Sequence, residues 1–196
     1  MKAVSLQKEI TGWGRYPRAR CHLYRPERVR EVMRILQGEE PESFLPRGLG
    51  RAYGDAALNS DGGVILMERL DRFLAFDPQT GVVRCEGGVP LADIIRTFLP
   101  RGWFLPVTPG TKFCTVGACV ACDVHGKNHH HDGSIGNFVR QISLLLPSGE
   151  TVLCSREGNA DLFFATLGSM GLTGVILEVE LQLRRVETAY IVVDYV

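Results

Sequence analysis

Hydrophobic residues recur with the period of an α-helix in three segments of the chain. Residues 26–37 carry an apolar stripe, with Pro26 at the first helical position, and residues 90–99 repeat this design between two prolines. A third, shorter helix is predicted to begin after Asn159, as its N-cap, and to end near Gly168. The stripes consist of Val29, Val32, Met33 and Leu36 in the first helix and of Leu91, Ile94, Ile95 and Phe98 in the second. Each stripe predicts a helix that packs one face on the core.

Segments typical of β-strands lie between these helices. Residues 175–183 alternate apolar and polar side chains, so one face of that strand is expected to be buried and the other wet. Tyr190 to Val196 form a further apolar, β-prone run with no closing turn. The other predicted strands cover 43–45, 63–67, 73–76, 82–85, 142–146 and 151–154. The irregular mixture of strands and helices favours an α+β fold, with a mixed sheet and flanking helices.

Composition narrows the class of protein. With 196 residues, of which 45% are hydrophobic, the chain can build a sizeable core of one or two domains. Its 22 basic and 22 acidic residues balance, which argues against the cationic surface of a general nucleic-acid binder. No apolar stretch approaches the roughly 18 to 20 residues of a membrane-spanning helix, and the N-terminus lacks the apolar segment of a secretory signal. The six cysteines are too few for a disulfide scaffold, and they predict reduced thiols in a reducing, cytoplasmic compartment.

A glycine-rich loop is the first candidate binding element. Arg47-Gly-Leu-Gly-Arg-Ala-Tyr-Gly-Asp55 follows a short predicted strand, and its three glycines permit positive φ angles and close approach of backbone N–H groups to a ligand. With its two arginines, it has the parts of a pyrophosphate cradle. It matches neither a Walker loop nor the glycine pattern of a Rossmann turn. An ordinary tight turn remains the alternative for this segment taken alone.

A second candidate element is a helix of small residues, predicted over 115–122. Thr115 can cap its start, which would leave backbone N–H groups and the positive end of the helix dipole pointed at an anion. Its all-round apolar character predicts a buried helix packed very closely on a neighbour. The polar stretch 123–136 follows and holds four of the five histidines, so we expect it to form a wall of the site.

Metal binding is an alternative for the same segment. Cys119, Cys122 and His125 have the types and one of the spacings of metal ligands, with Cys114 upstream. A second CxxC or a separated HxxxH pair is absent from the sequence, and packing explains small cysteines within an apolar helix. We therefore expect no metal, and a metal-binding module remains the alternative of another class.

With both elements described, the chain resembles flavoproteins of the vanillyl-alcohol oxidase / para-cresol methylhydroxylase class. Within that class, it is most similar to the FAD-containing oxidase subunits of decaprenylphosphoryl-ribose 2′-epimerases. The string His125-Gly-Lys-Asn-His-His130 is the most specific feature of this resemblance. The other motifs are Thr11-Gly-Trp-Gly-Arg15, the glycine loop, Pro109-Gly-Thr111, Thr115-Val-Gly117, Gly133-Ser134, Gly136-Asn137 and Gly171-Leu-Thr-Gly174.

The resemblance implies a domain organisation. The expected fold is the two-lobed FAD-binding domain of the para-cresol methylhydroxylase type, over residues 1–186. Its lobes are expected at about 1–77 and 78–186. Residues 187–196 would then begin a truncated substrate domain, and we expect the FAD-binding part alone to be inactive.

The resemblance also implies the cofactor and the residues around it, with FAD bound non-covalently. His125 and Lys127 would face the substrate. The glycine loop would wrap the pyrophosphate of FAD, the small-residue helix and the turn after it would lie along the flavin, and Ile176 would touch the adenine side. The cofactor-binding residues so implied are Pro46, Arg47, Gly48, Leu49, Gly50, Arg51, Ala52, Tyr53, Gly54, Asp55, Ala56, Gly110, Thr115, Val116, Gly117, Ala118, Cys122, Asp123, Val124, His125 and Ile176.

The implied chemistry is oxidation of a secondary alcohol of a sugar by hydride transfer to flavin N5. By resemblance, the substrate is the 2′-hydroxyl of a lipid-phosphate ribose, decaprenylphosphoryl-ribose, which implies peripheral membrane association. A separate nicotinamide-dependent reductase would complete the epimerisation. The alternatives are an FAD-linked oxidase of a soluble sugar or alditol and a flavin-binding module without catalysis.

Overall fold

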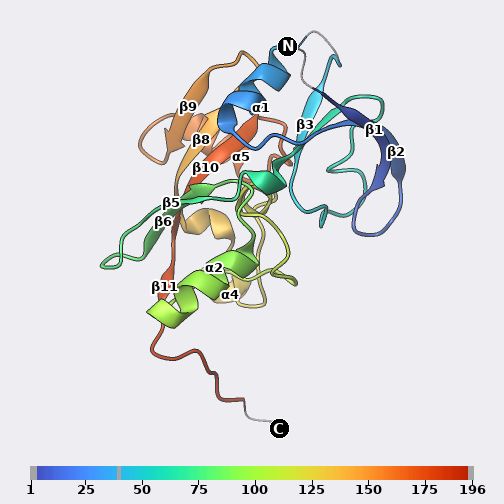
Figure 1. Cartoon of the computed structure of the whole chain (residues 1–196). Coiled ribbons are helices and arrows are strands. Elements are labelled where there is room, and N and C mark those ends of the chain that lie inside the picture. Colours follow the sequence, from blue (N-terminus) through green and yellow to red (C-terminus); the bar gives the residue numbers. More distant parts are fainter. Residues whose placement is uncertain (1–3, 39–40, 194–196) are drawn as a thin grey trace.

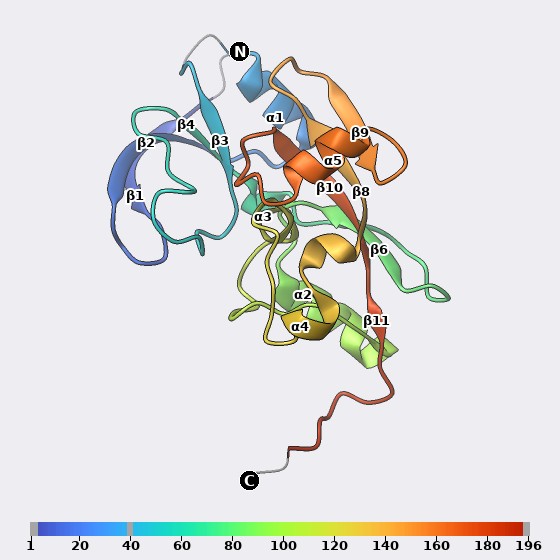
Figure 2. The ribbon, with the colours of Figure 1, turned by 180° about the vertical axis from the view of Figure 1, so that it is seen from behind.

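The computed structural model describes residues 4–38 and 41–193. Within these ranges the strands form a four-stranded sheet, a five-stranded sheet and a small two-stranded ladder (Figures 1 and 2). The mixed α/β character confirms the predicted class of sheets with flanking helices. Among the described residues, no helix combines the length and the apolarity needed to cross a membrane.

The four-stranded sheet is built from the N-terminal third of the chain, in the order β1-β2-β4-β3. Strands β1 (Leu6–Thr11) and β2 (Arg18–Tyr24) form an antiparallel pair. Strand β4 (Gly63–Leu66) runs parallel to β2 and to β3 (Phe44–Arg47). Helix α1 (Val29–Leu36) connects β2 to β3. The glycine loop therefore leaves this sheet at the C-terminal end of a parallel strand, where open sheets often bind ligands.

The five-stranded sheet is antiparallel, in the order β5-β6-β10-β8-β9. Its central strand, β10 (Val175–Gln182), has the predicted alternation, because its polar residues are only partly buried between buried apolar ones. The other strands are β5 (Phe73–Phe76), β6 (Val82–Glu86), β8 (Val139–Leu145) and β9 (Thr151–Ser155). This sheet carries the largest core of the chain.

Helices pack on the five-stranded sheet and bury its core. The α-helices are α2 (Leu91–Phe98), α3 (Val116–Ala121), α4 (His129–Asp132) and α5 (Ala160–Thr166). One of them, α3, lies between the two sheets (Figure 2). Single 3₁₀ turns span Met67–Arg69, Leu99–Arg101 and Ile135–Asn137, and β7 (Trp103–Phe104) pairs with β11 (Arg184–Arg185). Phe98 of α2 contacts Phe73 and Phe76 with ring centroids 5.1 and 4.5 Å apart, which fixes this helix on the sheet.

The predicted helices all form, but two of their starts differ from the prediction. Helix α1 begins at Val29, not at Pro26, because Arg28 is extended and the chain enters the helix only after it. Asn159 does precede α5, but its side chain does not cap the helix. Its φ is +54°, and its amide donates to the carbonyl of Leu153 instead.

Three predictions about strands need correction. Strands β1 and β2 were missing from the prediction. Strand β1 is mostly exposed and lacks an alternating pattern, and β2 alternates only over its first four residues. The short pair β7 and β11 was also missing. Residues 190–193 of the predicted terminal strand are exposed and have no regular secondary structure, and residues 194–196 lie outside the described ranges.

A buried carboxylate at the end of β6 offers a test of this packing. Glu86 is 2% exposed and accepts hydrogen bonds from the backbone N–H and from the guanidinium of Arg72. We expect Arg72→Ala to lower the free energy of unfolding by about 2–3 kcal/mol, because it leaves the buried charge unpaired. Denaturant unfolding measures this loss, and adding Glu86→Gln should restore part of it. Equal stability of Arg72→Ala and the parent chain would contradict the assigned pair.

Candidate functional site: a cleft between the glycine loop and helix α3

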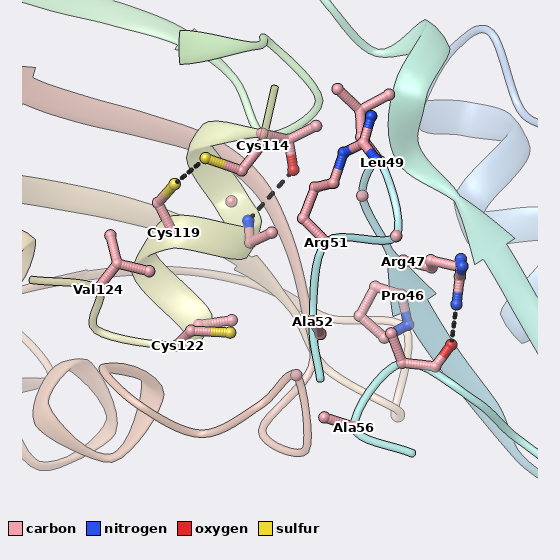
Figure 3. A pocket seen from close by; sticks show the side chains of 18 of the residues that line it. Pro46, Arg47, Leu49, Arg51, Ala52, Ala56, Cys114, Cys119, Cys122 and Val124 are labelled. Carbon is pink, nitrogen blue, oxygen red and sulfur yellow. Dashed lines mark hydrogen bonds between the residues drawn. The ribbon is translucent and has the colours of Figure 1, made fainter. Parts of the chain in front are cut away.

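A cleft of about 520 Å³ lies between the glycine loop and α3 (Figure 3). Its volume is in the range of pockets that hold cofactors. The loop after β3 forms one wall, and α3 with the segment 109–115 forms the other. Residues 170–176, before and at the start of β10, complete it. The cleft thus brings together the two candidate elements that were identified from the sequence.

The shape of the glycine loop depends on particular glycines. Gly50 and Gly54 have φ angles of +68° and +58°, in the left-handed region that favours glycine. A Cβ on Gly48 would collide with the hydroxyl of Thr115, so the loop passes directly against the start of α3. Gly12 lies equally close to the loop, because a Cβ there would be 2.8 Å from the carbonyl of Ala52. These contacts fix the width of the cleft at this end.

The backbone N–H groups of the glycine loop are its main hydrogen-bond donors for a ligand. In the part of the chain that the structure describes, none of the N–H groups from Gly48 to Ala56 donates a hydrogen bond within the protein. Most of these residues line the cleft. A row of backbone donors without partners is an arrangement that binds anions such as phosphate. The loop is therefore suited to a pyrophosphate through its backbone.

The sequence predicted that both arginines of the loop would be part of a pyrophosphate cradle, but the structure gives them two different roles. Arg47 donates to the carbonyls of Thr11, at 2.6 Å, and Ala57, at 2.8 Å, so its guanidinium braces the loop (Figure 3). Burial lowers the pKa of Arg47. Arg51 is exposed, donates through Nε to the carbonyl of Phe113 at 3.2 Å, and lies 4.7 Å from the ring centroid of Trp13. Arg51 is thus the arginine of the loop that remains available at the cleft.

Helix α3 has the predicted cap but not the predicted free donors. The Thr115 hydroxyl accepts from the N–H of Ala118 at 3.4 Å. The N–H of Val116 donates to the carbonyl of Val89, and the N–H of Gly117 donates to that of Gly87, both at 2.8 Å. The first turn of α3 therefore has no spare N–H at these positions for an anion, which corrects the expectation. Its small residues are explained by this close backbone contact, since a Cβ on Gly117 would lie 2.9 Å from the Gly87 oxygen.

Most of the predicted cofactor residues line this one cleft. Those that do so are Pro46, Arg47, Gly48, Leu49, Gly50, Arg51, Ala52, Tyr53, Ala56, Gly110, Thr115, Gly117, Ala118, Cys122, Val124 and Ile176. Gly54 and Asp55 are exposed at the turn that follows, and Val116 is fully buried in the core. Asp123 has a φ of +41°, and its carboxylate accepts from the N–H of Gly136 at 2.9 Å, so it holds the chain after α3.

His125 and Lys127, the expected substrate-side residues, lie outside the lining of the cleft. Both are exposed, on the turn between α3 and α4. His125 pairs with Ser134 in an isolated bridge, and its ring lies 5.2 Å from that of His129. The amide of Asn128 donates to the carbonyl of Pro106 at 2.9 Å and fixes the turn. Val124 is the neighbour of His125 that reaches the cleft, so both polar side chains lie beyond this wall.

Several residues that line the cleft were not among the cofactor residues predicted from the sequence. They are Trp13, Ala57, Met67, Gly87, Pro109, Thr111, Cys114, Cys119, Ala121, Met170, Gly171 and Gly174. Trp13, Pro109, Thr111, Gly171 and Gly174 belong to motifs that carried the resemblance, which was the available signal. Gly87 and Met67 had no such signal, because only the folded chain brings them to α3 and to the loop.

The cysteines near α3 form a pair rather than a ligand set. The sulfur of Cys119 donates to that of Cys114, with 3.3 Å between the two atoms. Cys122 also lines the cleft, and burial raises the pKa of its thiol. Within residues 4–38 and 41–193, no group of three or more His, Cys, Asp or Glu side chains is arranged to hold a metal ion.

Two comparisons cover most of the chain. A family model described as an FAD binding domain matches residues 21–155. Decaprenylphosphoryl-beta-D-ribose oxidase from Mycolicibacterium smegmatis is 40% identical over 191 residues, which are 95% of this chain and 42% of that protein. The resemblance inferred from the motifs is thereby confirmed.

Other relatives are more distant. L-gulonolactone oxidase from Bos taurus is 29% identical over 181 residues, which are 92% of this chain and 40% of that protein. D-lactate dehydrogenase from Anaerostipes hadrus is 28% identical over 162 residues, 80% of this chain and 34% of that protein. The chain therefore spans less than half the length of these relatives.

Proposed function

Because the chain belongs to the family of FAD-binding domains and has FAD as its cofactor, we propose that the cleft between the glycine loop and α3 is where FAD binds. The observation that carries this placement is the row of loop N–H groups from Gly48 to Ala56, which have no partner among the residues that the structure describes. They suit the pyrophosphate, and Arg51 adds a positive charge at the same wall. The small residues of α3 that line the cleft, such as Ala118 and Ala121, would let a flat ring system lie against this helix.

The two sheets support a division of the domain into two lobes. We infer that the four-stranded sheet is the core of one lobe and the five-stranded sheet the core of the other. This division puts the border before β5, because β5 pairs with β6 in the second sheet, whereas the sequence suggested a border near residue 77. Residues 187–196 would then lead into a substrate domain, as the resemblance implies.

We propose that the complete protein is an FAD-linked oxidoreductase acting on CH–OH groups. The relatives named above are oxidases and a dehydrogenase, and the one at 40% identity is named for decaprenylphosphoryl-ribose. We therefore propose the 2′-hydroxyl of a lipid-phosphate ribose as the position oxidised. Bound FAD would supply the electron acceptor for the hydride of the alcohol carbon. The chain would orient the ring system between α3 and the loop.

His125 and Lys127 are proposed to act on the substrate side. Both lie on the turn after α3, next to a residue that lines the cleft, and both are exposed. An exposed lysine there can meet the phosphate of a lipid-phosphate sugar, and His125 can contact the sugar. A nicotinamide-dependent reductase would return the ketone to an alcohol. The six free thiols agree with the proposed cytoplasmic location, and a lipid substrate would bring the enzyme to the membrane surface.

Substrate class is tested on the full-length enzyme. Under anaerobic conditions, decaprenylphosphoryl-ribose should bleach the flavin absorbance, and free polyols or L-gulonolactone should bleach it far more slowly. The reverse order would instead support the alternative function, oxidation of a soluble sugar, alditol or lactone. Acid precipitation should leave the flavin in the supernatant, because binding is proposed to be non-covalent. Colour in the pellet would contradict that part of the proposal.

A further inference from the structure

Two thiols in the wall of the cleft are close enough to react with each other. Cys114 follows the segment 109–113, and Cys119 lies on α3, and both line the cleft. Their sulfurs are 3.3 Å apart and not bonded (Figure 3). A disulfide requires about 2.05 Å between the sulfurs, so closure needs an approach of only about 1.2 Å.

We propose that Cys114 and Cys119 form a peroxide-reactive dithiol, a site at which this chain is reversibly oxidised to an intramolecular disulfide. The surroundings of the two sulfurs differ, and this difference assigns one thiol to attack the peroxide and the other to close the disulfide. The hydrogen bond from Cys119 lowers the pKa of the Cys114 thiol, and the nearby Arg51 guanidinium lowers it further. The same hydrogen bond, together with burial, raises the pKa of Cys119. Cys114 is also the more accessible of the two, at 9% exposed against 1% for Cys119, so we assign Cys114 as the attacking sulfur and Cys119 as the resolving one.

The reaction balances with hydrogen peroxide as the only oxidant. The Cys114 thiolate attacks one peroxide oxygen, the O–O bond breaks, and hydroxide leaves, which produces a sulfenic acid at Cys114. The Cys119 sulfur, giving up its proton, then attacks the Cys114 sulfur. The S–O bond breaks, water is formed, and the S–S bond closes. In sum, two thiols and one peroxide give one disulfide and two waters, and an added dithiol reverses the change.

The remaining cysteines provide the contrast that makes the site selective. Burial raises the pKa of Cys85 to about 12, so its thiol stays protonated at ordinary pH. Burial also raises the pKa values of Cys122 and Cys154. Cys122 shares the cleft with the pair but takes no part in the hydrogen bond between the two sulfurs. It is therefore the matched control for accessibility.

The chain itself offers a direct assay. Trypsin releases one peptide, Phe113 to Lys127, that contains Cys114, Cys119 and Cys122. The reduced chain is treated with hydrogen peroxide, blocked with an alkylating reagent and digested. We expect this peptide to lose two hydrogens and to carry one alkyl group instead of three, with that group on Cys122. Crosslinks to Cys122 should be less abundant by at least roughly tenfold, because its thiolate is disfavoured. Treatment with dithiothreitol should restore three alkylation sites.

Variants assign the two roles. In Cys119→Ala, dimedone should trap a sulfenic acid on Cys114, because the resolving thiol is missing. Cys122→Ala should form the crosslink as fast as the parent chain. The proposal is overturned if the parent peptide keeps three alkylation sites, or if the main crosslink involves Cys122. Because the parent chain alone gives this answer, a variant that fails to fold does not affect it. The reaction is run on the flavin-free chain, because bound FAD would cover both thiols in the proposed cleft. Its outcome therefore does not depend on the proposed function.

Discussion

Gly110→Phe is expected to weaken FAD binding strongly and to leave the chain as stable as the parent. Gly110 lines the cleft, and a Cβ built on it meets no atom within 4 Å. The new side chain can therefore start without a clash and would extend into space that the cofactor needs. We expect the FAD dissociation constant to rise at least roughly 100-fold, which is about 2.7 kcal/mol. Flavin fluorescence titration measures the affinity, and thermal unfolding of the apoprotein measures the stability.

A matched control separates the size of the side chain from its position. Gly158 lies outside the cleft on the exposed turn between β9 and α5, where a Cβ would be 3.6 Å from the Ser155 hydroxyl. Gly158→Phe should therefore bind FAD like the parent chain. If Gly110→Phe bound FAD with unchanged affinity, the cofactor would have to lie elsewhere.

Arg47→Met is expected to lower both stability and FAD affinity, because Arg47 braces the loop. The substitution leaves the carbonyls of Thr11 and Ala57 without their charged donor. Hydrogen bonds to charged groups contribute about 1.5–3 kcal/mol each. Because Arg47 is only partly buried, we expect the lower end of the sum for two bonds, a fall of about 3–4 kcal/mol in the free energy of unfolding of the apoprotein. The disordered loop then presents its N–H groups poorly, and FAD affinity should fall with it. Denaturant unfolding and flavin titration measure the two effects.

Arg51→Met should show the opposite signature. Arg51 is exposed and donates only through Nε to one carbonyl, so apoprotein stability should change by less than about 1 kcal/mol. The affinity for FAD should fall, and it should depend less on the salt concentration than in the parent chain, because a charge near the pyrophosphate is removed. If Arg47→Met weakened FAD binding with no loss of apoprotein stability, Arg47 would contact the phosphate directly, and its assignment as a brace would be wrong.

These different roles of two neighbouring arginines show what the sequence could not reveal. The carbonyls that Arg47 binds lie 36 and 10 residues away along the chain. Nothing in the spacing of the loop indicates them. The same holds for α3, since its first N–H groups pair with the backbone of Gly87 and Val89. The cap at Thr115 was predictable because it is local, whereas the loss of the free donors depends on a distant segment.

The fold was predictable where local pattern and tertiary packing agree. The stripes of α1 and α2 and the alternation of β10 all correspond to buried faces. Strand β1 could not be predicted from the sequence, because it is an edge strand whose residues are mostly exposed. It is defined by its pairing with β2 and not by a buried face. The prediction of a strand at 190–193 was wrong although the residues are apolar and β-prone. Such residues form a strand only where a partner strand is present.

The most direct measurement is the binding of FAD to the purified 196-residue chain. The apoprotein is incubated with excess FAD, passed through a gel-filtration column, and its absorbance spectrum is recorded. If the cleft holds FAD, the protein peak carries a flavin spectrum with one FAD per chain, and Gly110→Phe elutes colourless under the same conditions. A folded parent chain that elutes without flavin, or a Gly110→Phe variant that retains it in full, would contradict the placement of the cofactor.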